Sequence, residues 1–380
     1  MTRIIYWNNI PAPYMVERFN ALVRRGSFEF EAWFSARTEK GRSWSVDERS
    51  WEFRYRYMYG GRGGWRALTT PQRLLRENVP DVFVSLYAGP AFLLGSFIAQ
   101  RRGARTAFWL ERTFDSVVTR RRWKESLKSR VLPKADGILT TGEDGRDFAR
   151  RYAVRENRLF TVPHVVDFAR YARQSADGLA EREELRSRLG LRGLTFVYVG
   201  KLTRAKGLDY LVEAFVALAR PANADVSLLL VGDGADEALL RGQCEQAGVR
   251  NVVFAGFYGA DTLPHLYAAG DVFVFPTLGD TFGMVVSEAM ACGLPVIATS
   301  SSGEIRERVS EGVNGFIVPP ADSVTLAERM ALLASDAELR KRMGEASRAK
   351  VAGQSADVWA QAFEDAVVEI LRMPRARDAR

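Results

Sequence analysis

Short apolar runs alternate along the chain with segments whose apolar residues recur at helical spacing. In the first half the strand-like runs are RIIYW, FEFEAWF, VFVSL, TAFWL and GILTT, and helical patterns such as VERFNALVRR and LLGSFIAQRR separate most of them. In the second half TFVYVG, SLLLVG, NVVFAG, DVFVFP and PVIAT are strand-like, whereas LDYLVEAFVALA and EALLRGQCEQAG are helical. This alternation predicts an α/β protein with parallel, doubly wound sheets.

The length of 380 residues favours two such domains over one. We expect a first Rossmann-like domain over residues 1–172 and a second over 173–355, with the polar segment from Tyr171 to Leu185 as a linker. The last helix, 356–374, carries apolar residues at helical spacing, so we expect it to cross back and pack on the first domain. Residues 40–66, rich in Arg, Trp, Tyr and Gly, predict a long irregular or β-hairpin insertion.

The uncharged stretch 82–99 needs consideration as a membrane span. Ala-Gly-Pro at 88–90 divides it, and a span needs about 20 continuous apolar residues, so we expect a strand, a turn and a short helix. The N-terminal apolar run is too short for a signal peptide. Cys244 and Cys292 fit neither a metal spacing nor a disulfide framework, which favours a cytoplasmic location.

The net charge of +8 is unevenly spread along the chain. Residues 1–174 hold 32 Lys and Arg against 18 Asp and Glu, a net +14, and residues 175–380 hold 22 against 28, a net −6. The basic half favours an anionic partner such as phosphates, nucleic acid or an acidic membrane face. An ordinary solvated basic surface is the alternative.

Three segments of the second half carry candidate chemistry. In the first, a strand ends at Gly200, and a loop with Lys201, Arg204 and Lys206 precedes a helix near Gly207. The carboxyl ends of parallel strands form a ligand crevice, and lysine binds phosphate as a point charge, so a diphosphate fits here. A solvated basic loop is an equally simple explanation.

The second segment is PTLGDTFGMVVSEAMACGLPVIAT, residues 276–299. Gly279 and Gly283 allow a close approach of backbone to ligand, and the helix that follows favours an anion at its N-terminus. Asp280 on the loop and Glu288 on the helix could hold hydroxyl groups of one ligand. The alternative is a core helix with a turn aspartate.

The third segment places Gly232, Gly234 and Gly256 directly after strands, with Phe257 next to Gly256, where backbone can meet a base or ribose. The pattern is not G-x-G-x-x-G, so a nicotinamide fingerprint is not supported. The sequence also lacks Walker A, H-E-x-x-H, G-x-S-x-G and Asp-x-Asp strings, and His164 and His265 are its two histidines. A histidine-based triad or metal site therefore has little material.

Together these motifs resemble the retaining glycosyltransferase family 4, whose fold is GT-B, two Rossmann-like domains. The resemblance covers nearly all of residues 195–350 through GKLTRAKG, the GDG strand end, the Phe-Gly pair, EAMACGLPVI and EGVNGFIVP. The first half matches weakly, chiefly at NIPAPYMVERFNAL and VPHVVD. The resemblance implies a nucleotide-sugar donor site in the second domain and an acceptor site in the first.

The resemblance also implies a role for individual residues. Lys201 and Lys206 match the two cations that hold the donor diphosphate, although the family often has Arg at the first. Glu288 matches the carboxylate that binds the ribose, and Asp280 stands where the family usually has a Glu that contacts the transferred sugar. The stretch whose backbone meets sugar and phosphate is matched by Phe282, Gly283, Met284 and Val285.

The first domain departs from the family pattern. The histidine that many relatives carry in the catalytic site has no match, and FWLERTFD occupies about that place, so Glu111 and Arg112 are the candidates there. His164 stands where an Asn is common, and we interpret it as structural. The loop NNIPAPY lacks the glycine pair that many relatives use near the phosphate.

We therefore expect a retaining, metal-independent glycosyltransferase that needs no cofactor besides its UDP- or GDP-sugar substrate. Many relatives act on lipid-linked or saccharide acceptors in cell-surface polysaccharide synthesis. The basic, aromatic first half favours peripheral contact with an anionic membrane, and no nucleic-acid recognition module is present. A catalytically weak donor-binding scaffold, or another GT-B enzyme such as an epimerase or phosphorylase, is the alternative.

Overall fold

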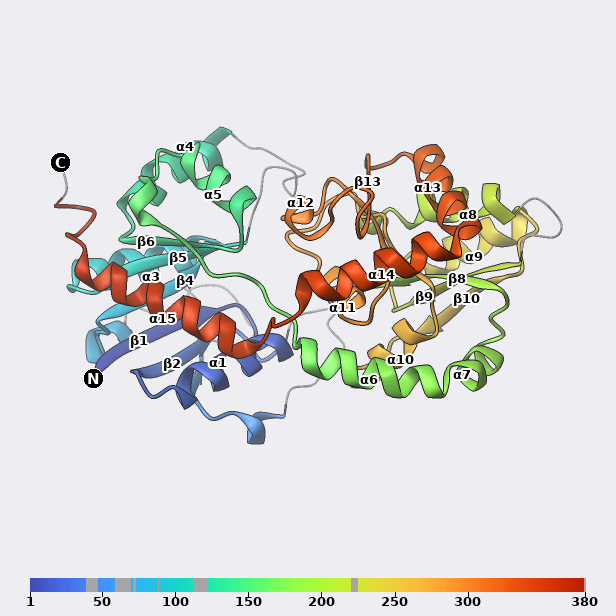
Figure 1. Cartoon of the computed structure of the whole chain (residues 1–380). Coiled ribbons are helices and arrows are strands. Elements are labelled where there is room, and N and C mark those ends of the chain that lie inside the picture. Colours follow the sequence, from blue (N-terminus) through green and yellow to red (C-terminus); the bar gives the residue numbers. More distant parts are fainter. Residues whose placement is uncertain are drawn as a thin grey trace. The chain divides into compact units, whose positions relative to one another are not determined.

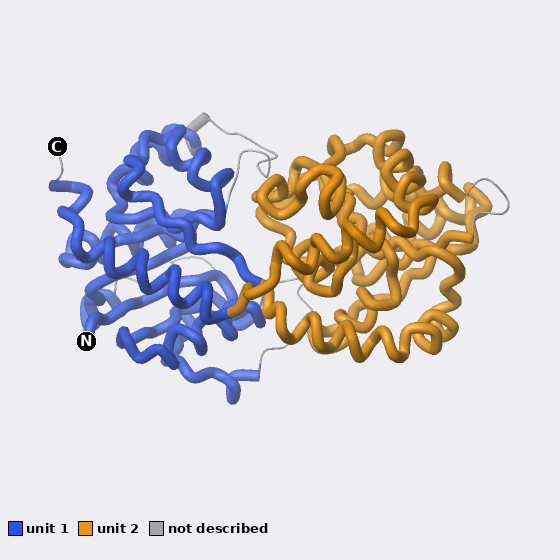
Figure 2. Tube along the Cα trace, viewed as in Figure 1, with its two compact units in different colours: residues 1–112, 119–165, 356–380 blue, residues 113–118, 166–355 orange. Residues whose placement is uncertain are grey.

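The computed structural model describes the chain except residues 39–46, 59–69, 71–72, 88, 112–121, 220–224 and 379–380. The chain forms two compact units (Figure 2). The first unit holds Met1–Arg112, Thr119–Val165 and Ala356–Arg380, and the second holds Thr113–Val118 and Val166–Ser355. The main segment of the first unit thus ends at Val165, a few residues before the domain boundary expected from the sequence.

The first unit is built on a seven-stranded sheet in the order β3-β2-β1-β4-β5-β6-β7 (Figure 1). Its strands are β1 (Thr2–Asn8), β2 (Phe28–Phe34), β3 (Arg54–Tyr57), β4 (Val82–Leu86), β5 (Arg105–Leu110), β6 (Gly137–Thr140) and β7 (Leu159–Thr161). Every neighbouring pair is parallel. The strand order reverses between β1 and β4, which makes that point the topological switch of the sheet.

Both faces of this sheet are apolar, as a buried parallel sheet requires. The covering helices are α1 (Pro13–Arg24), α3 (Pro90–Arg101), α4 (Arg122–Val131), α5 (Glu143–Arg150) and α15 (Ala356–Arg372). Successive β1 residues point to opposite faces: Tyr6 joins the core under α1 and α15, and Trp7 joins the core under α3. The chain's last helix, α15, packs against α1 in the first unit.

The second unit repeats the design with six strands in the order β10-β9-β8-β11-β12-β13. Its strands are β8 (Leu194–Val199), β9 (Val226–Val231), β10 (Val252–Gly256), β11 (Val272–Phe275), β12 (Val296–Thr299) and β13 (Gly315–Val318). Its helices are α6 (Phe168–Ala180), α7 (Arg182–Leu189), α8 (Leu208–Ala219), α9 (Glu237–Gln246), α10 (Leu263–Ala268), α11 (Met284–Ala291), α12 (Ile305–Arg308), α13 (Ser323–Ser335) and α14 (Ala337–Val351). The switch point lies between β8 and β11, the two central strands.

The expected linker from Tyr171 to Leu185 is wrong, because α6 and α7 occupy this segment. The Asp167 carboxylate caps α6 by accepting a hydrogen bond from the Arg170 amide at 3.0 Å. Gly178 lets α6 approach α10 closely, since a Cβ there would lie 2.9 Å from the His265 Cα. The sequence looks polar because one side of the helix is solvated while Tyr171, Ser175 and Gly178 are buried.

The described part of the expected 40–66 insertion is also not a hairpin. Its strand β3 pairs in parallel with β2, and a two-strand hairpin requires antiparallel strands. Residues 40–46 and 59–66 of that expectation lie outside the described residues.

The stretch 82–99 is a strand followed by a helix, as predicted. Among the helices that the structure describes, none is long and apolar enough to cross a bilayer. Cys244 and Cys292 are both buried and unpaired, and burial raises the pKa of the Cys292 thiol to about 12.

Substitution of Phe363 tests how much the last helix, α15, contributes to the stability of the first unit. Its ring is fully buried and stacks on Trp359 with a centroid distance of 4.9 Å. Phe363→Ala should cost about 3–5 kcal/mol in the free energy of unfolding. All eight tryptophans lie in segments of the first unit, so tryptophan fluorescence in urea reports that unit selectively. The control Val358→Ala, at an exposed position of α15, should change the free energy of unfolding by less than about 0.5 kcal/mol.

Candidate functional site

The loops after β8 and β11 meet at the switch point of the second unit. The loop after β8 carries Lys201 and a single 3₁₀ turn, Arg204–Lys206, and then enters α8 through Gly207. The Leu278 amide of the loop after β11 donates to the Ala205 carbonyl at 3.0 Å. Gly207 has φ +63°, and any Cβ there would collide with the Pro276 carbonyl oxygen. A glycine is therefore required where the two loops touch.

Lys206 and Asp280 form an ion pair between these loops. Both side chains are about four-fifths buried, with exposed fractions of 22% and 17%. The second carboxylate oxygen of Asp280 accepts a hydrogen bond from the Phe282 amide at 3.0 Å, which fixes the turn. The structure thus brings together two residues that the sequence places 74 positions apart.

The same loop delivers the N-terminus of α11. Gly283 precedes the helix in the left-handed conformation, with φ +74°, and a Cβ there would lie 2.7 Å from the Phe275 ring. The amide groups of Met284 and Val285 are in the first turn, where no helical carbonyl precedes them, so they can serve an anion.

Glu288 lies one turn further along α11 and is held by tyrosines. The Tyr267 hydroxyl on α10 lies 2.9 Å from a Glu288 carboxylate oxygen. Burial, followed by the negative charge of Glu288, raises the pKa of both Tyr267 and Tyr171 well above the ordinary value. These phenols therefore stay protonated at neutral pH and can donate to the carboxylate. Sequence reasoning missed both tyrosines, and it placed Tyr171 in a linker.

The glycines at the neighbouring strand ends pack tightly on one another. Gly232 donates its amide to the Gly256 carbonyl at 2.8 Å, and Gly200 donates to Val231 at 2.9 Å. Any Cβ on Gly232 would overlap the Gly200 carbonyl oxygen. Close packing of backbone is thus one reason for these glycines. Phe257 follows β10 and is 47% exposed, so its ring can contact a ligand.

Arg308 braces the loop from behind, and sequence reasoning missed it. It is 7% exposed, and its guanidinium donates to the carbonyl oxygens of Gly283 at 2.8 Å and Gly303 at 2.9 Å. It also donates to the Phe282 carbonyl and lies 4.0 Å from the centroid of the Phe282 ring. Arg308 ends the short charged helix α12, a few residues after a Ser-Ser-Ser-Gly loop, and this pattern alone does not mark it as buried.

Glu111 belongs to the first unit, where it follows β5. Its side chain is 30% exposed and accepts a hydrogen bond from the Trp109 indole at 2.9 Å, while His164 Nε2 lies 3.4 Å away. Burial by itself raises the pKa of Glu111, but the contacts with His164 and Trp109 and the charge of Arg18 outweigh it and lower that pKa. Glu111 is thus ionised at neutral pH. Arg112, the other candidate, lies outside the described residues.

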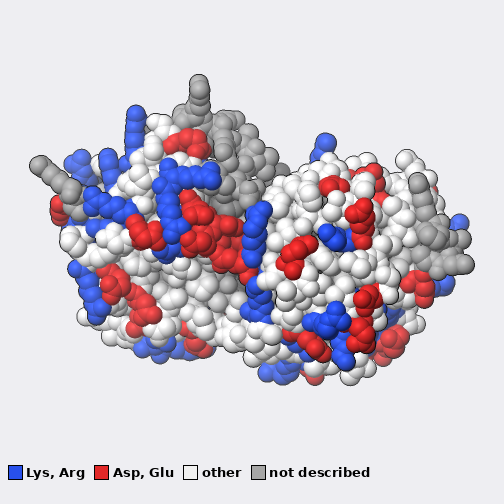
Figure 3. All heavy atoms as spheres, turned by 45° about the horizontal axis from the view of Figure 1, so that its top comes forward, with Lys and Arg blue, Asp and Glu red and all other residues white. Residues whose placement is uncertain are grey.

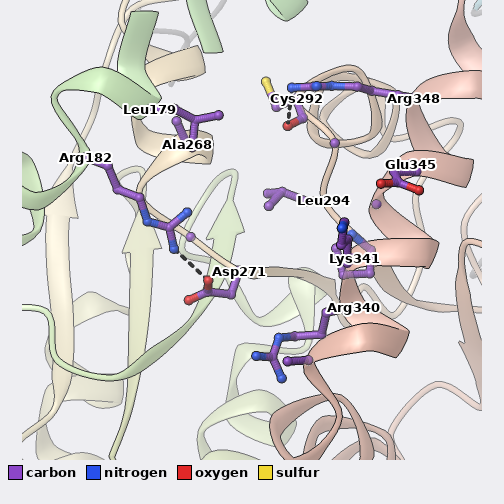
Figure 4. A pocket seen from close by; sticks show the side chains of 15 residues that line it. Leu179, Arg182, Ala268, Asp271, Cys292, Leu294, Arg340, Lys341, Glu345 and Arg348 are labelled. Carbon is purple, nitrogen blue, oxygen red and sulfur yellow. Dashed lines mark hydrogen bonds and ion pairs between the residues drawn. The ribbon is translucent and has the colours of Figure 1, made fainter. Parts of the chain in front are cut away.

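A separate hollow of about 360 Å³ lies at the amino ends of β11 and β12, the opposite edge of the second sheet (Figure 4). Two of the arginines that line it make contacts within the unit. Arg182 pairs with Asp271 at 2.6 Å, and Arg340 donates to the Leu333 carbonyl at 2.6 Å near the end of α13. We therefore do not treat it as a reaction site. The described residues contain no group of three His, Cys, Asp or Glu that could hold a metal ion.

Comparisons with solved structures identify the class of fold. A crystal structure of HepE from Anabaena in complex with UDP matches with a TM-score of 0.77 at 18% identity, over 97% of this chain and 100% of that one. Two parallel-sheet α/β units of this kind define the GT-B fold. The expected fold class is confirmed.

Sequence comparisons then identify the family. The family described as glycosyl transferases group 1 matches residues 181–350, and the glycosyl transferase 4-like domain matches residues 11–164. Residues 181–350 therefore belong to the glycosyl transferases of group 1, as the motifs indicated.

Curated relatives agree with this assignment. The chain is 30% identical over 238 residues to alpha-D-kanosaminyltransferase of Streptomyces kanamyceticus, covering 62% of this chain and 59% of the relative. It is also 30% identical over 251 residues to D-inositol 3-phosphate glycosyltransferase of Xylanimonas cellulosilytica, with the same coverage. The chain thus spans about three-fifths of the length of these relatives.

Replacing Arg308 tests whether it braces the loop. Arg308→Met removes a donor from each of three buried carbonyls. Phe282 keeps the Ser302 hydroxyl and Gly283 keeps the Val286 amide, so the main loss is at Gly303, at about 1–3 kcal/mol. We expect the amides of residues 280–286 to exchange hydrogen at least tenfold faster, measured by mass spectrometry. The control is Arg306→Met, which removes an exposed arginine from the same helix. Equal exchange of this segment in both variants would contradict the role.

Proposed function

We propose that the protein is a retaining glycosyltransferase that moves a sugar from a UDP- or GDP-sugar to a lipid-linked or saccharide acceptor. One observation carries the donor part of this proposal. The carboxyl ends of β8 and β11 bring two lysines, two carboxylates and a helix N-terminus to one switch point. Cations and free amides suit a diphosphate, and carboxylates suit the hydroxyl groups of ribose and sugar.

Each donor group has a proposed partner. Lys201, Lys206 and the first amides of α11 hold the diphosphate, with Arg204 at the rim of the loop. Glu288, oriented by Tyr267, accepts hydrogen bonds from the ribose. Asp280 contacts the transferred sugar, and the glycines and Phe257 lie next to the base. The relative named above that was solved with UDP supports a uridine donor as the first one to test.

The ion pair between Lys206 and Asp280 has a consequence for binding. A diphosphate must compete with the Asp280 carboxylate for the Lys206 ammonium, which carries three hydrogen-bond donors. When the ammonium turns to the phosphate, the Asp280 oxygen becomes available to a sugar hydroxyl. Donor binding thereby replaces the contact between Lys206 and Asp280 by two contacts, one from Lys206 to the phosphate and one from Asp280 to the sugar hydroxyl.

The reaction breaks the bond between the anomeric carbon and the diphosphate and forms a bond from that carbon to the acceptor oxygen. The negative charge that develops on the leaving diphosphate is stabilised by Lys201, Lys206 and the dipole of α11. The acceptor proton passes to a phosphate oxygen on the same face, so the configuration is retained and no protein base is needed. In the first unit Glu111 accepts a hydrogen bond from the substrate.

Mutation of the ion pair separates binding from transfer. Lys206→Ala should weaken UDP or GDP binding about 10- to 150-fold in calorimetry, the worth of a charged hydrogen bond. Asp280→Ala frees the lysine and should bind the nucleotide at least as tightly as the wild type, yet transfer sugar far more slowly than Asp280→Asn. Unchanged nucleotide affinity of folded Lys206→Ala would remove this lysine from the site.

A panel of UDP- and GDP-sugars tests the reaction itself. Turnover of one donor, with retention of the anomeric configuration by NMR, supports the proposal. Tight binding without hydrolysis or transfer would instead support a donor-binding scaffold within a polysaccharide assembly.

We further propose that the first unit contacts an anionic membrane surface while the protein works on cell-surface polysaccharide. The net +14 of residues 1–174 supports this. Two observations limit how far a continuous basic surface can extend on the first unit. Basic and acidic side chains are interspersed on the face in Figure 3, and Lys128 of α4 is buried against Glu125.

Vesicle binding tests the membrane contact. Vesicles with anionic lipid should capture the protein at 50 mM salt and release most of it at 500 mM, because salt screens exposed charges. Neutral vesicles are the control. Equal partitioning onto both kinds of vesicle would contradict electrostatic contact.

A further inference from the structure

A buried chain of polar side chains links α1 to the end of β5 in the first unit. Arg18, at 1% exposure, has its guanidinium Nη1 2.8 Å from His164 Nδ1. His164 Nε2 lies 3.4 Å from Glu111 Oε1, which also receives the Trp109 indole hydrogen bond. Arg18 Nη2 donates to the Val165 carbonyl at 3.0 Å and so fixes the backbone next to the histidine.

The direction of these hydrogen bonds determines where the histidine proton is. A guanidinium has donors and no acceptor, so His164 Nδ1 must accept from Arg18 and carries no proton. The proton of the neutral ring is then on Nε2, the nitrogen that faces Glu111. Protonating Nδ1 would set two donors against each other at 2.8 Å, inside a site where His164 is 5% exposed.

We propose that Arg18 and His164 are positioning residues for Glu111. Arg18 holds the His164 imidazole neutral with its proton on Nε2. The Nε2–H group of His164 then donates a hydrogen bond to the Glu111 carboxylate. Glu111, which is already ionised, is thereby oriented by a neutral donor that does not cancel its charge, so it stays a hydrogen-bond acceptor across the neutral pH range. The inference rests on the proposed function in that Glu111 is taken to act on substrate.

The surroundings of His164 support this assignment. From α1, the Tyr14 ring lies edge-on at a centroid distance of 6.1 Å, and Glu17 acts on Arg18 through its charge. From β1, Tyr6 would act on Arg18 in the same way if it were ionised. From β5, Trp109 lies edge-on at 5.7 Å. From α15, the uncharged Trp359 faces the Arg18 guanidinium at 6.0 Å. Glu111 attracts a proton to His164, and the fixed cation of Arg18 opposes it from the other side.

The geometry also leaves Glu111 able to act. Trp109 and His164 both contact the Oε1 atom of the Glu111 carboxylate, and the Glu111 side chain is 30% exposed. Its other oxygen can therefore meet a substrate hydroxyl without losing the bonds that hold it.

NMR of the histidine rings tests the tautomer without any assay of activity. The chain has two histidines, so His265→Ala leaves the signals of His164 alone. Long-range proton–nitrogen correlation should show a neutral ring protonated on Nε2 from pH 5.5 to 8. In Arg18→Met the same ring should gain a proton within this range. A charged ring, or one protonated on Nδ1, in the unmutated Arg18 background at pH 7 would overturn the proposal.

The pH profile separates positioning from simple stabilisation. With the best donor of the sugar panel, kcat/KM of Arg18→Met should fall about tenfold between pH 8 and 5.5 relative to wild type, as the freed imidazole becomes charged beside Glu111. A purely structural role would lower activity equally at every pH, and that result would overturn the proposal. The exposed neighbour Arg24→Met is the control and should keep the wild-type profile.

A second variant removes the titration while keeping the donor. Gln places its amide nitrogen near the imidazole Nε2 position and cannot become charged. Arg18→Met with His164→Gln should therefore restore the flat profile, and failure to do so in a folded protein would contradict the account. Unfolding in urea, followed by the tryptophan fluorescence that reports the first unit, serves as the check on folding. If no nucleotide sugar turns over, the proposed function fails, and the NMR result still decides the tautomer.

Discussion

The contact between the loops after β8 and β11 is the constraint on which the rest of the second unit's site depends. Gly207 can have no side chain there, because the Pro276 carbonyl occupies the space. This contact brings Lys206 to Asp280 and sets the start of α11, which in turn carries Glu288 to the tyrosines of α6 and α10. A displacement of the loop would move both carboxylates and the helix N-terminus together.

The two units use buried arginines in a similar way. Arg308 spans several carbonyl oxygens behind the loop at Gly283, and Arg18 bridges a histidine and a backbone carbonyl beside Glu111. In each case a guanidinium supplies several directed donors that lysine could not supply from one point. These interactions hold the backbone at the ends of parallel strands, where the folds of this class bind ligands.

The sequence predicted most elements of the fold because strand and helix periodicities are strong in a buried parallel sheet. It failed at α6 and α7, where a polar surface conceals a narrow buried stripe that includes Gly178. It also failed at β3, whose parallel pairing depends on partners distant in the chain. The motifs place their candidate residues in the loops after β8 and β11 and on α11, and the roles of these residues toward a donor stay predictions. They could not predict Arg308, Tyr267 or Arg18, since these residues act through contacts that only the tertiary structure creates.

A crystal structure of the protein with UDP or GDP bound tests the central claim most directly. The account predicts the diphosphate within hydrogen-bond distance of Lys206 and the amides of Met284 and Val285, with the ribose hydroxyls on Glu288. It also predicts that Lys206 has turned from Asp280 to the phosphate. A nucleotide bound elsewhere, with the ion pair between Lys206 and Asp280 intact, would contradict the account.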